Sequence, residues 1–203
     1  MKSEEFLDVS RETLERLEKY TELLIRWNQR INLVAKSTIA DVWSRHILDS
    51  AQIFDIPKRT IHHWADLGSG GGFPGMVVAI LASENDNPFL VSLVESDIRK
   101  AVFLKTVVRE LGLAAHVLTA RIEDLEPLNA DVISARALAD LPQLFEYSEK
   151  HLAEGGCVVF PKGKNWRSEV ERAQRKWNFD YQIDKSKTSE GSVILCASGV
   201  SRV

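Results

Sequence analysis

The chain has 203 residues, of which 44% are hydrophobic and 27% are charged, and its formal net charge is -3. This length and composition predict one globular domain, or one domain with an extension, that can bury a core. The slightly acidic balance argues against a protein that coats nucleic acid nonspecifically, although it leaves room for a local basic surface. No apolar run reaches the roughly 20 residues that a membrane span needs. Because residues 1–30 are charged throughout, we also expect no signal peptide and assign the chain to the cytoplasm.

The first 60 residues predict a helical extension that packs beside a ligand crevice. Apolar residues recur at spacings of three, four and seven over residues 3–31, with Asp8 or Ser10 as candidate caps. A second helix is predicted over residues 37–55, with Ser37 or Thr38 as candidate caps, because its apolar side continues to Phe54 before Pro57 ends it.

Residues 61–203 alternate between strand and helix patterns and form the second predicted domain. Strands are expected over 61–67, 89–94, 115–119, 131–135, 157–160, 179–184 and 193–197, and helices over 74–82, 97–111, 141–152 and 166–177. Turns are expected over 85–88 and at Gly155-Gly156, and Gly112 should end a helix. The alternation predicts an α/β fold with a mostly parallel sheet. Two closing strands with no helix between them predict an antiparallel last strand, as in Rossmann-like methyltransferases.

A glycine-rich loop with the sequence DLGSGGGFPG begins at Asp66, where the first predicted strand ends. The glycines at 68, 70 and 72 give the spacing GxGxG, whereas the dinucleotide fingerprint GxGxxG would need a glycine at Phe73. A phosphate-binding loop needs a Gly-Lys-Ser/Thr ending, and no lysine occurs between residues 59 and 99. The remaining candidate is the loop shape that binds S-adenosylmethionine. Asp66 would cap or anchor this loop, or meet the ligand's ammonium group.

Three further segments complete a predicted nucleoside site. Glu95 ends the second strand, where a carboxylate can accept hydrogen bonds from both ribose hydroxyls. Ile122 and Glu123 border the expected adenine position, and Glu123 either accepts from an amino group or caps a turn. Arg136 closes the fourth strand and would face the crevice, unless it is a surface arginine without a specific contact. Cys157 and Cys196 lie in apolar runs and predict reduced core thiols, and no spacing predicts a metal site.

Together these residues resemble a family, the bacterial small-subunit rRNA guanine-N7 methyltransferases, also called methyltransferase G or glucose-inhibited division protein B. The resemblance covers roughly residues 20–165. Besides the glycine loop, it rests on the segments Trp27-Asn28, Asn32-Leu33-Val34, Trp43–Ser50 (close to W-x-R-H-x-L-D-S), Glu95-Ser96, Arg99-Lys100, Phe103-Leu104, Ser134–Ala137 and Lys162-Gly163. One departure is Ile122, where the family usually has alanine, and this affects only the packing around adenine.

The resemblance implies S-adenosylmethionine as methyl donor and a guanine N7 of 16S rRNA, in the decoding-site hairpin, as acceptor. The implied partner is 16S rRNA or the 30S subunit, and we expect a monomer. The predicted cofactor-binding residues are Asp66, Gly68, Gly70, Gly72, Phe73, Glu95, Ser96, Ile122, Glu123 and Arg136. Arg136 could instead contact guanine or RNA phosphate.

Guanine N7 carries a free lone pair, so methyl transfer to it needs no general base, and we assign no catalytic acid or base. Positioning of the reactants can supply about 7–11 kcal/mol, with Arg136 and Lys162 as positioning candidates. The predicted RNA-facing residues are Lys36, Arg45, His46, Arg99, Lys100, Lys162 and Lys164. Each of them could also be a solvated surface charge, and His46 could be a packed histidine bonded to Asp49 or to backbone.

Two alternatives remain open on the sequence alone. The chain could be an S-adenosylmethionine-dependent methyltransferase of a small molecule or a protein, although the exposed Lys and Arg expected on the extension favour a large anionic substrate. It could also be a non-enzymatic RNA- or nucleoside-binding module, although the intact loop together with Glu95 argues against this.

Overall fold

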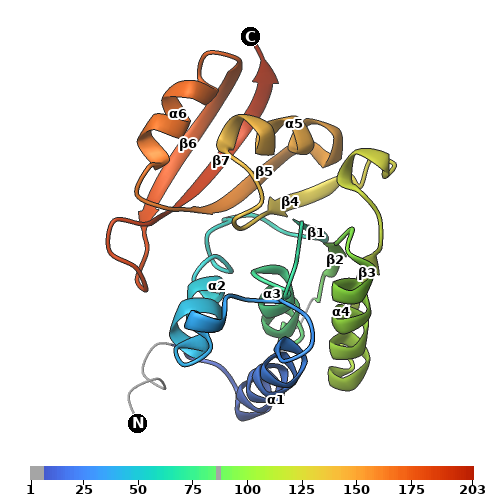
Figure 1. The fold of residues 1–203 in the computed structure, drawn as a ribbon. Helices are drawn as coiled ribbons and strands as arrows, with labels where there is room; N and C mark the ends of the chain where they lie inside the picture. Colours follow the sequence, from blue (N-terminus) through green and yellow to red (C-terminus); the bar gives the residue numbers. More distant parts are fainter. Residues whose placement is uncertain (1–6, 86–87) are drawn as a thin grey trace.

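A computed structural model describes residues 7–85 and 88–203 and contains a seven-stranded sheet in the order β3-β2-β1-β4-β5-β7-β6 (Figure 1). β1 to β5 pair in parallel, whereas β7 lies between β5 and β6 and runs antiparallel to both. This arrangement confirms the predicted α/β fold with an antiparallel last strand. The strands are β1 (His63–Leu67), β2 (Leu90–Val94), β3 (Ala115–Leu118), β4 (Ala130–Ser134), β5 (Leu152–Lys162), β6 (Trp177–Lys185) and β7 (Val193–Arg202).

Helices cover both faces of the sheet (Figure 1). Side chains alternate between the two faces along each strand, so Trp64 and Ala65 belong to different apolar clusters. The cluster around Trp64 includes residues of α1, α3 and α4, and the cluster around Ala65 includes residues of α5 and α6. The helices are α1 (Arg11–Asn28), α2 (Asp49–Ala51), α3 (Gly75–Ala82), α4 (Ile98–Leu111), α5 (Leu141–His151) and α6 (Trp166–Ala173).

The N-terminal extension is less regular than the apolar pattern predicts. α1 begins at Arg11 rather than at residue 3, because the Ser10 hydroxyl caps it by accepting from the Thr13 N–H at 3.1 Å. Residues 3–6 lie outside the described residues. The helix predicted over 37–55 is divided into a 3₁₀ turn (Lys36–Thr38), a π-helical segment (Trp43–Leu48) and α2. Neither Ser37 nor Thr38 caps a longer helix, because the chain turns again between residues 39 and 42 before the π-helical segment begins.

The C-terminal part contains longer strands and a shorter helix than predicted. β5 begins at Leu152, so the predicted turn at Gly155-Gly156 lies inside a strand, in a stretch of β5 between Leu152 and Cys157 where the register with β4 shifts. β7 lies between β5 and β6 and pairs with both. This pairing makes the strands longer than their apolar sequence patterns predict. α6 ends at Ala173 rather than at Trp177, because Trp177 starts β6 and is buried there. Part of the turn predicted over 85–88 lies outside the described residues.

The extension packs directly against the glycine loop. Leu17, Tyr20 and Leu24 of α1 are fully buried in the same cluster as α3 and α4. The Tyr20 hydroxyl donates a hydrogen bond of 2.6 Å to the carbonyl oxygen of Gly71. This buried contact joins the first helix to the loop that follows β1.

Candidate active site

The carboxylate of Asp66 lies beneath the glycine loop at the end of β1. Its side chain is fully buried, and Oδ1 accepts a hydrogen bond of 2.7 Å from the Ser134 hydroxyl at the end of β4. The Ser134 oxygen in turn accepts from the Trp64 indole N–H at 2.9 Å. Oδ2 is buried without a hydrogen-bond partner in the described part of the chain. Of the predicted roles, this geometry favours anchoring of the loop over direct contact with a ligand's ammonium group.

Burial raises the pKa of Asp66 from its ordinary value near 3.8 to about 6, because the charged carboxylate has lost its water. The Ser134 hydrogen bond opposes this rise, as do the nearby Ser69 hydroxyl, the Gly75 backbone N–H and the positive charge of Arg136. The carboxyl therefore remains mostly ionised at neutral pH at a cost in folding free energy.

The glycines of the loop serve different purposes. Gly72 has a φ of 99°, and a Cβ there would lie 2.6 Å from the Tyr20 hydroxyl. Gly75 has no unusual φ, but a Cβ there would lie 2.4 Å from Cβ of Asp66, so this position needs glycine for close packing. Around Gly70, which has a φ of 57°, a Cβ would meet only open space and one backbone oxygen. Gly70 thus presents bare backbone to a cavity.

Glu95 joins the loop to α4 through both of its carboxylate oxygens. Oε2 accepts from the Gly70 N–H and Oε1 from the Asp97 N–H, each at 2.7 Å. Asp97 itself caps α4 by accepting from the Arg99 and Lys100 N–H groups at 2.8 and 3.3 Å. Glu95 is only 7% exposed, so its position is fixed before any ligand binds. A carboxylate has further lone pairs that can accept from ligand hydroxyls.

A cavity of about 300 Å³, which we call the nucleoside cavity, lies beside Glu95. Its wall includes the predicted residues Gly68, Gly70, Glu95, Ser96, Ile122 and Glu123. It also includes residues that were not predicted for the cofactor, among them Lys100, Arg121, Ala137, Leu138 and Tyr147. Phe73, Gly72 and Asp66 do not line it.

Phe73 is 3% exposed and lies beneath Arg136, whose guanidinium carbon is 4.9 Å from the centre of the ring. The His46 ring stacks on Phe73 with 5.0 Å between centroids. Phe73 of the glycine loop therefore packs against the N-terminal extension. Phe73 thus stabilises the loop by packing and does not line the nucleoside cavity.

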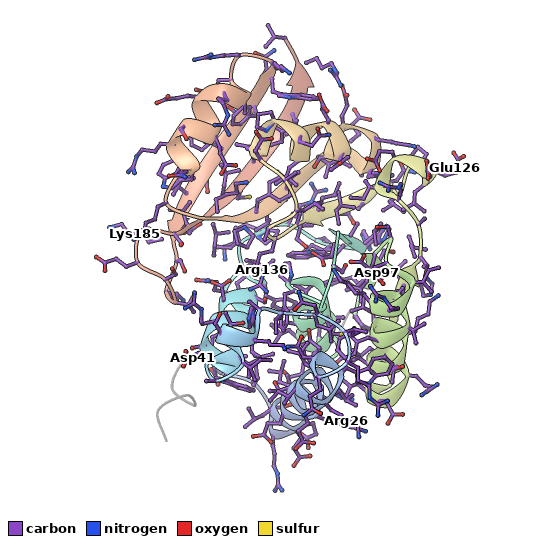
Figure 2. All side chains as sticks on the ribbon, in the orientation of Figure 1. Arg26, Asp41, Asp97, Glu126, Arg136 and Lys185 are labelled. Atoms are coloured by element: carbon purple, nitrogen blue, oxygen red, sulfur yellow. The ribbon has the colours of Figure 1, made fainter. Side chains whose placement is uncertain are left out.

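Arg136 is held by the π-helical segment of the extension. Its guanidinium donates to His46 Nδ1 at 2.8 Å, to Asp49 Oδ2 at 3.2 Å and to the Arg45 carbonyl oxygen at 3.2 Å. Figure 2 shows Arg136 between the sheet and the helices of the extension. The π-helical segment, a form common at functional sites, thus supplies two acceptors to this guanidinium, and Asp49, which directly follows the segment, supplies the third.

These contacts define the protonation state of His46. Because Arg136 donates to Nδ1, that nitrogen must be an acceptor, and Nε2–H then donates to the Thr38 hydroxyl at 2.8 Å. Burial and the positive charge of Arg136 lower the pKa of His46 from 6.5 to about 4. His46 is therefore neutral at physiological pH. The alternative that His46 is a packed histidine holds in part, although its partners are Arg136 and Thr38 rather than Asp49.

A second cavity of about 450 Å³ lies on the other side of the β4 end, and we call it the acceptor cavity. It shares Ala137 with the nucleoside cavity, and Ala137 has a left-handed φ of 53°, a strained backbone of the kind that clusters at functional sites. Its wall comes from the extension, the ends of β4 and β5, α6, the loop between β6 and β7, and the start of β7. The wall residues used below are Arg45, Asp49, Arg136, Lys162, Glu169 and Thr188.

The loop between β6 and β7 is docked onto the extension. The Thr188 hydroxyl donates to Asp49 Oδ1 at 2.6 Å, and the Lys187 N–H donates to the Gln52 side-chain oxygen at 2.9 Å. Asp49 thus accepts from Thr188 through one oxygen and from Arg136 through the other. A single carboxylate connects the C-terminal hairpin to the end of β4.

The predicted RNA-facing residues fall into three groups. Arg45 and Lys162 line the acceptor cavity, and Lys100 lines the nucleoside cavity. His46 holds Arg136, as described above. Lys162 is only 9% exposed and forms an ion pair with Glu169, so it is not a free surface charge. The remaining three are exposed and line neither cavity: Lys36, Arg99, which pairs with Asp97, and Lys164.

Several wall residues were not found from the sequence. Asp49 belongs to the W-x-R-H-x-L-D-S segment. Its place about one helical turn after His46 could have indicated that both side chains face the same site. Thr188, Gln52 and Glu169 carried no signal, because only the folded chain brings the extension, α6 and the loop between β6 and β7 to the same cavity.

Comparison with known proteins identifies the family. Residues 13–193 match the family described as "rRNA small subunit methyltransferase G". The chain is a member of this family. A Ribosomal RNA small subunit methyltransferase G from Ruegeria sp. (strain TM1040) is 51% identical over 197 residues, which are 97% of this chain and 96% of that relative. Its counterpart from Ruegeria pomeroyi is 50% identical over 198 residues, with the same shares of the two chains.

Membership in the methyltransferase G family makes the chain an enzyme that methylates ribosomal RNA, as the sequence predicted. It does not favour a methyltransferase of small molecules or proteins, nor a non-enzymatic binding module. A solved O-methyltransferase from Bacillus cereus, in complex with SAH, superposes with a TM-score of 0.58 at 13% identity, covering 96% of this chain and 94% of that one. This likeness confirms the Rossmann-like methyltransferase fold.

Within the described residues, no helix is long and apolar enough to span a membrane, and no cluster of His, Cys, Asp and Glu could hold a metal ion.

We predict that Asp66→Asn changes how folding stability depends on pH. The native state, with an Asp66 pKa of about 6, binds this proton more tightly than the unfolded chain, with a pKa near 3.8. The carboxyl therefore contributes its full stability below about pH 4 and loses it as the pH rises through about 6. Relative to the wild type, the variant should gain about 1–1.5 kcal/mol between pH 5 and pH 7.5.

Urea unfolding of the ligand-free proteins at the two pH values measures this gain. Asp180→Asn, at an exposed aspartate of β6, is the control and should show no gain. A stability difference for Asp66→Asn that does not change with pH would contradict the prediction.

Proposed function

We propose that the chain transfers the methyl group of S-adenosylmethionine to N7 of a guanine in 16S rRNA. The observation that carries this proposal is the pair of cavities that meet at Ala137, beyond the carboxyl end of β4. Open α/β sheets bind ligands at this edge. One cavity has the features of a nucleoside site, and the other can hold the acceptor base.

The residues of the nucleoside cavity fit S-adenosylmethionine. Glu95 is fixed by two backbone N–H groups, so its remaining lone pairs are oriented to accept from the ribose hydroxyls. The bare backbone of Gly70 allows a close approach of the ligand. Ile122 offers an apolar surface to adenine. The Glu123 carboxylate lies on the same wall and can accept from the adenine amino group.

When bound, S-adenosylmethionine supplies an electrophilic methyl group on a positively charged sulfur. The protein then has to place guanine N7 in line with this methyl group, and no proton has to be removed from N7. His46 is neutral and its two ring nitrogens are already bonded, so it is not available as a general base. Arg136 is fixed by three acceptors and forms one wall of the acceptor cavity, where it can position the base.

The RNA would approach over the acceptor cavity, with the target base turned out of its stack. Arg45 is exposed at the rim of this cavity, and Lys36 and Lys164 are exposed elsewhere on the chain, where they can contact phosphates. We further propose that the substrate is 16S rRNA or the 30S subunit, that the enzyme acts as a monomer in the cytoplasm, and that residues 1–60 form an extension to a catalytic domain over 61–203.

The decisive experiment supplies labelled S-adenosylmethionine and unmethylated small-subunit rRNA to the purified protein. The product is digested to nucleosides and analysed by mass spectrometry. We expect the label in 7-methylguanosine. Label in a different nucleoside would contradict guanine N7 as the acceptor, and label in protein or small molecules alone would contradict the RNA substrate.

We predict that methyl transfer at saturating substrates varies little between about pH 7 and pH 8.5, because no general base has to lose a proton. The pKa of His46, lowered to about 4, and that of Asp66, raised to about 6, both lie below this range. Single-turnover rates measured across the range check this. A tenfold rise governed by one ionisation would indicate a base that the structure does not assign.

Replacement of Glu95 should weaken cofactor binding far more than RNA binding. Glu95→Ala removes the acceptors for the ribose and leaves the Gly70 and Asp97 N–H groups unbonded, whereas Glu95→Gln keeps one acceptor for the backbone. We expect at least a roughly tenfold weaker Kd for S-adenosylmethionine in both variants by calorimetry, with RNA affinity within about twofold. Glu126→Ala, at an exposed glutamate outside both cavities, is the control. Unchanged cofactor affinity would refute the ribose assignment.

A further inference from the structure

A nearly buried ion pair lies in the wall of the acceptor cavity. Lys162, the last residue of β5, contacts Glu169 of α6, and their side chains are only 7% and 16% exposed. The Lys162 ammonium also lies 3.4 Å from the carbonyl oxygen of Ala139. Glu169 Oε2 additionally accepts from the Leu141 N–H, at the start of α5, at 2.9 Å. Both members of the pair line the cavity.

The pair has hydrogen-bonding capacity that the described part of the protein does not use. An ammonium has three N–H donors, and those of Lys162 serve Glu169 and Ala139. Glu169 uses Oε2 for both of its contacts, so Oε1 has no hydrogen-bond partner among the described residues. One donor and one charged acceptor therefore stand next to each other at the cavity wall. Burying such a pair costs desolvation energy, and a cap for the Leu141 N–H alone would not require the lysine.

This juxtaposition matches the Watson–Crick edge of guanine. That edge presents the acceptor O6 next to the donors N1–H and N2–H₂. Adenine presents the opposite pattern, a donor at N6 and an acceptor at N1. N7 is present in both purines, so the reacting atom itself cannot distinguish them. Selection of guanine has to come from the other edge, which also leaves N7 free for the methyl group.

We propose that Lys162 and Glu169 recognise the acceptor guanine, with Lys162 donating to O6 and Glu169 Oε1 accepting from N1–H and N2–H. This inference rests on the proposed function, because it places the methylated base in the acceptor cavity. It assigns to Glu169 a specificity role, and to Lys162 the positioning role at O6. Adenine in the same place would set its N6 amino group against the Lys162 ammonium, donor against donor, and its N1 lone pair against the Glu169 carboxylate. A site that hydrogen-bonds its substrate in this way rejects such a base strongly.

The test compares Glu169→Gln with the wild type on two RNAs. One RNA carries guanosine, and the other inosine, at the position that mass spectrometry identifies as methylated. Inosine keeps N7, O6 and N1–H but lacks the N2 amino group, so it removes one donor to Glu169. For the wild type we expect kcat/KM to be about 10- to 100-fold lower on the inosine RNA. For Glu169→Gln we expect a similar loss on the guanosine RNA and a guanosine-to-inosine ratio close to one.

The ratio separates recognition from a structural role. If Glu169 only stabilised the start of α5, its replacement would lower both rates equally and leave the ratio unchanged, which would overturn the proposal. Equal wild-type rates on the two RNAs would overturn it as well, while the proposed function would stand. Failure of the wild type to methylate the guanosine RNA would instead refute the proposed function.

Two controls accompany this test. Glu171→Gln makes the same change on α6 at an exposed residue outside the cavity and should behave as the wild type. The Kd for S-adenosylmethionine should be unchanged in Glu169→Gln, whereas the melting temperature should fall, because the nearly buried Lys162 loses its charged partner. If that variant unfolds, Glu169→Asp, which keeps the charge but withdraws the carboxylate by one methylene, should show the same collapse of the ratio, and an unchanged ratio there would equally overturn the proposal.

Discussion

The rest of the site depends on one buried carboxylate that connects two parallel strands. Asp66 lies near the end of β1 and accepts from Ser134 at the end of β4. It is so close to Gly75 that no side chain fits there. This contact places the glycine loop and the turn that carries Arg136 at the same edge of the sheet. The charge is unfavourable in its buried position, as the raised pKa of Asp66 indicates. The protein thus accepts a loss of stability to fix the loop, a compromise common at functional sites.

Residues far apart in the chain complete this arrangement around Arg136. The guanidinium lies over Phe73 of the loop and donates to His46 and Asp49 of the extension. Asp49 also accepts from Thr188, so the C-terminal hairpin is part of the same network. The extension is therefore part of the site itself, because it supplies the hydrogen-bond acceptors that orient Arg136 on the wall of the acceptor cavity.

The fold and half of the site could be predicted from local sequence. The glycine loop, Glu95 and the strand-helix alternation each depend on neighbouring residues, and the structure places Gly68, Gly70 and Glu95 on one cavity. The extension was predicted less well, because the pattern that suggested one helix over 37–55 does not reveal a π-helical segment stabilised by contacts with Arg136. The acceptor cavity was missed, because its wall joins residues far apart in the chain, among them Asp49 of the extension, Glu169 of α6 and Thr188 of the loop between β6 and β7.

The two cavities differ in how much of the chain they require. The nucleoside cavity is lined by residues between 68 and 147, whereas the acceptor cavity draws on residues from 45 to 194. During synthesis, the parts of the nucleoside cavity therefore leave the ribosome while β7 is still unmade. The wall that would hold an RNA base closes only when the last strand inserts between β5 and β6. The chain therefore completes the segments that line the nucleoside cavity before those that line the acceptor cavity.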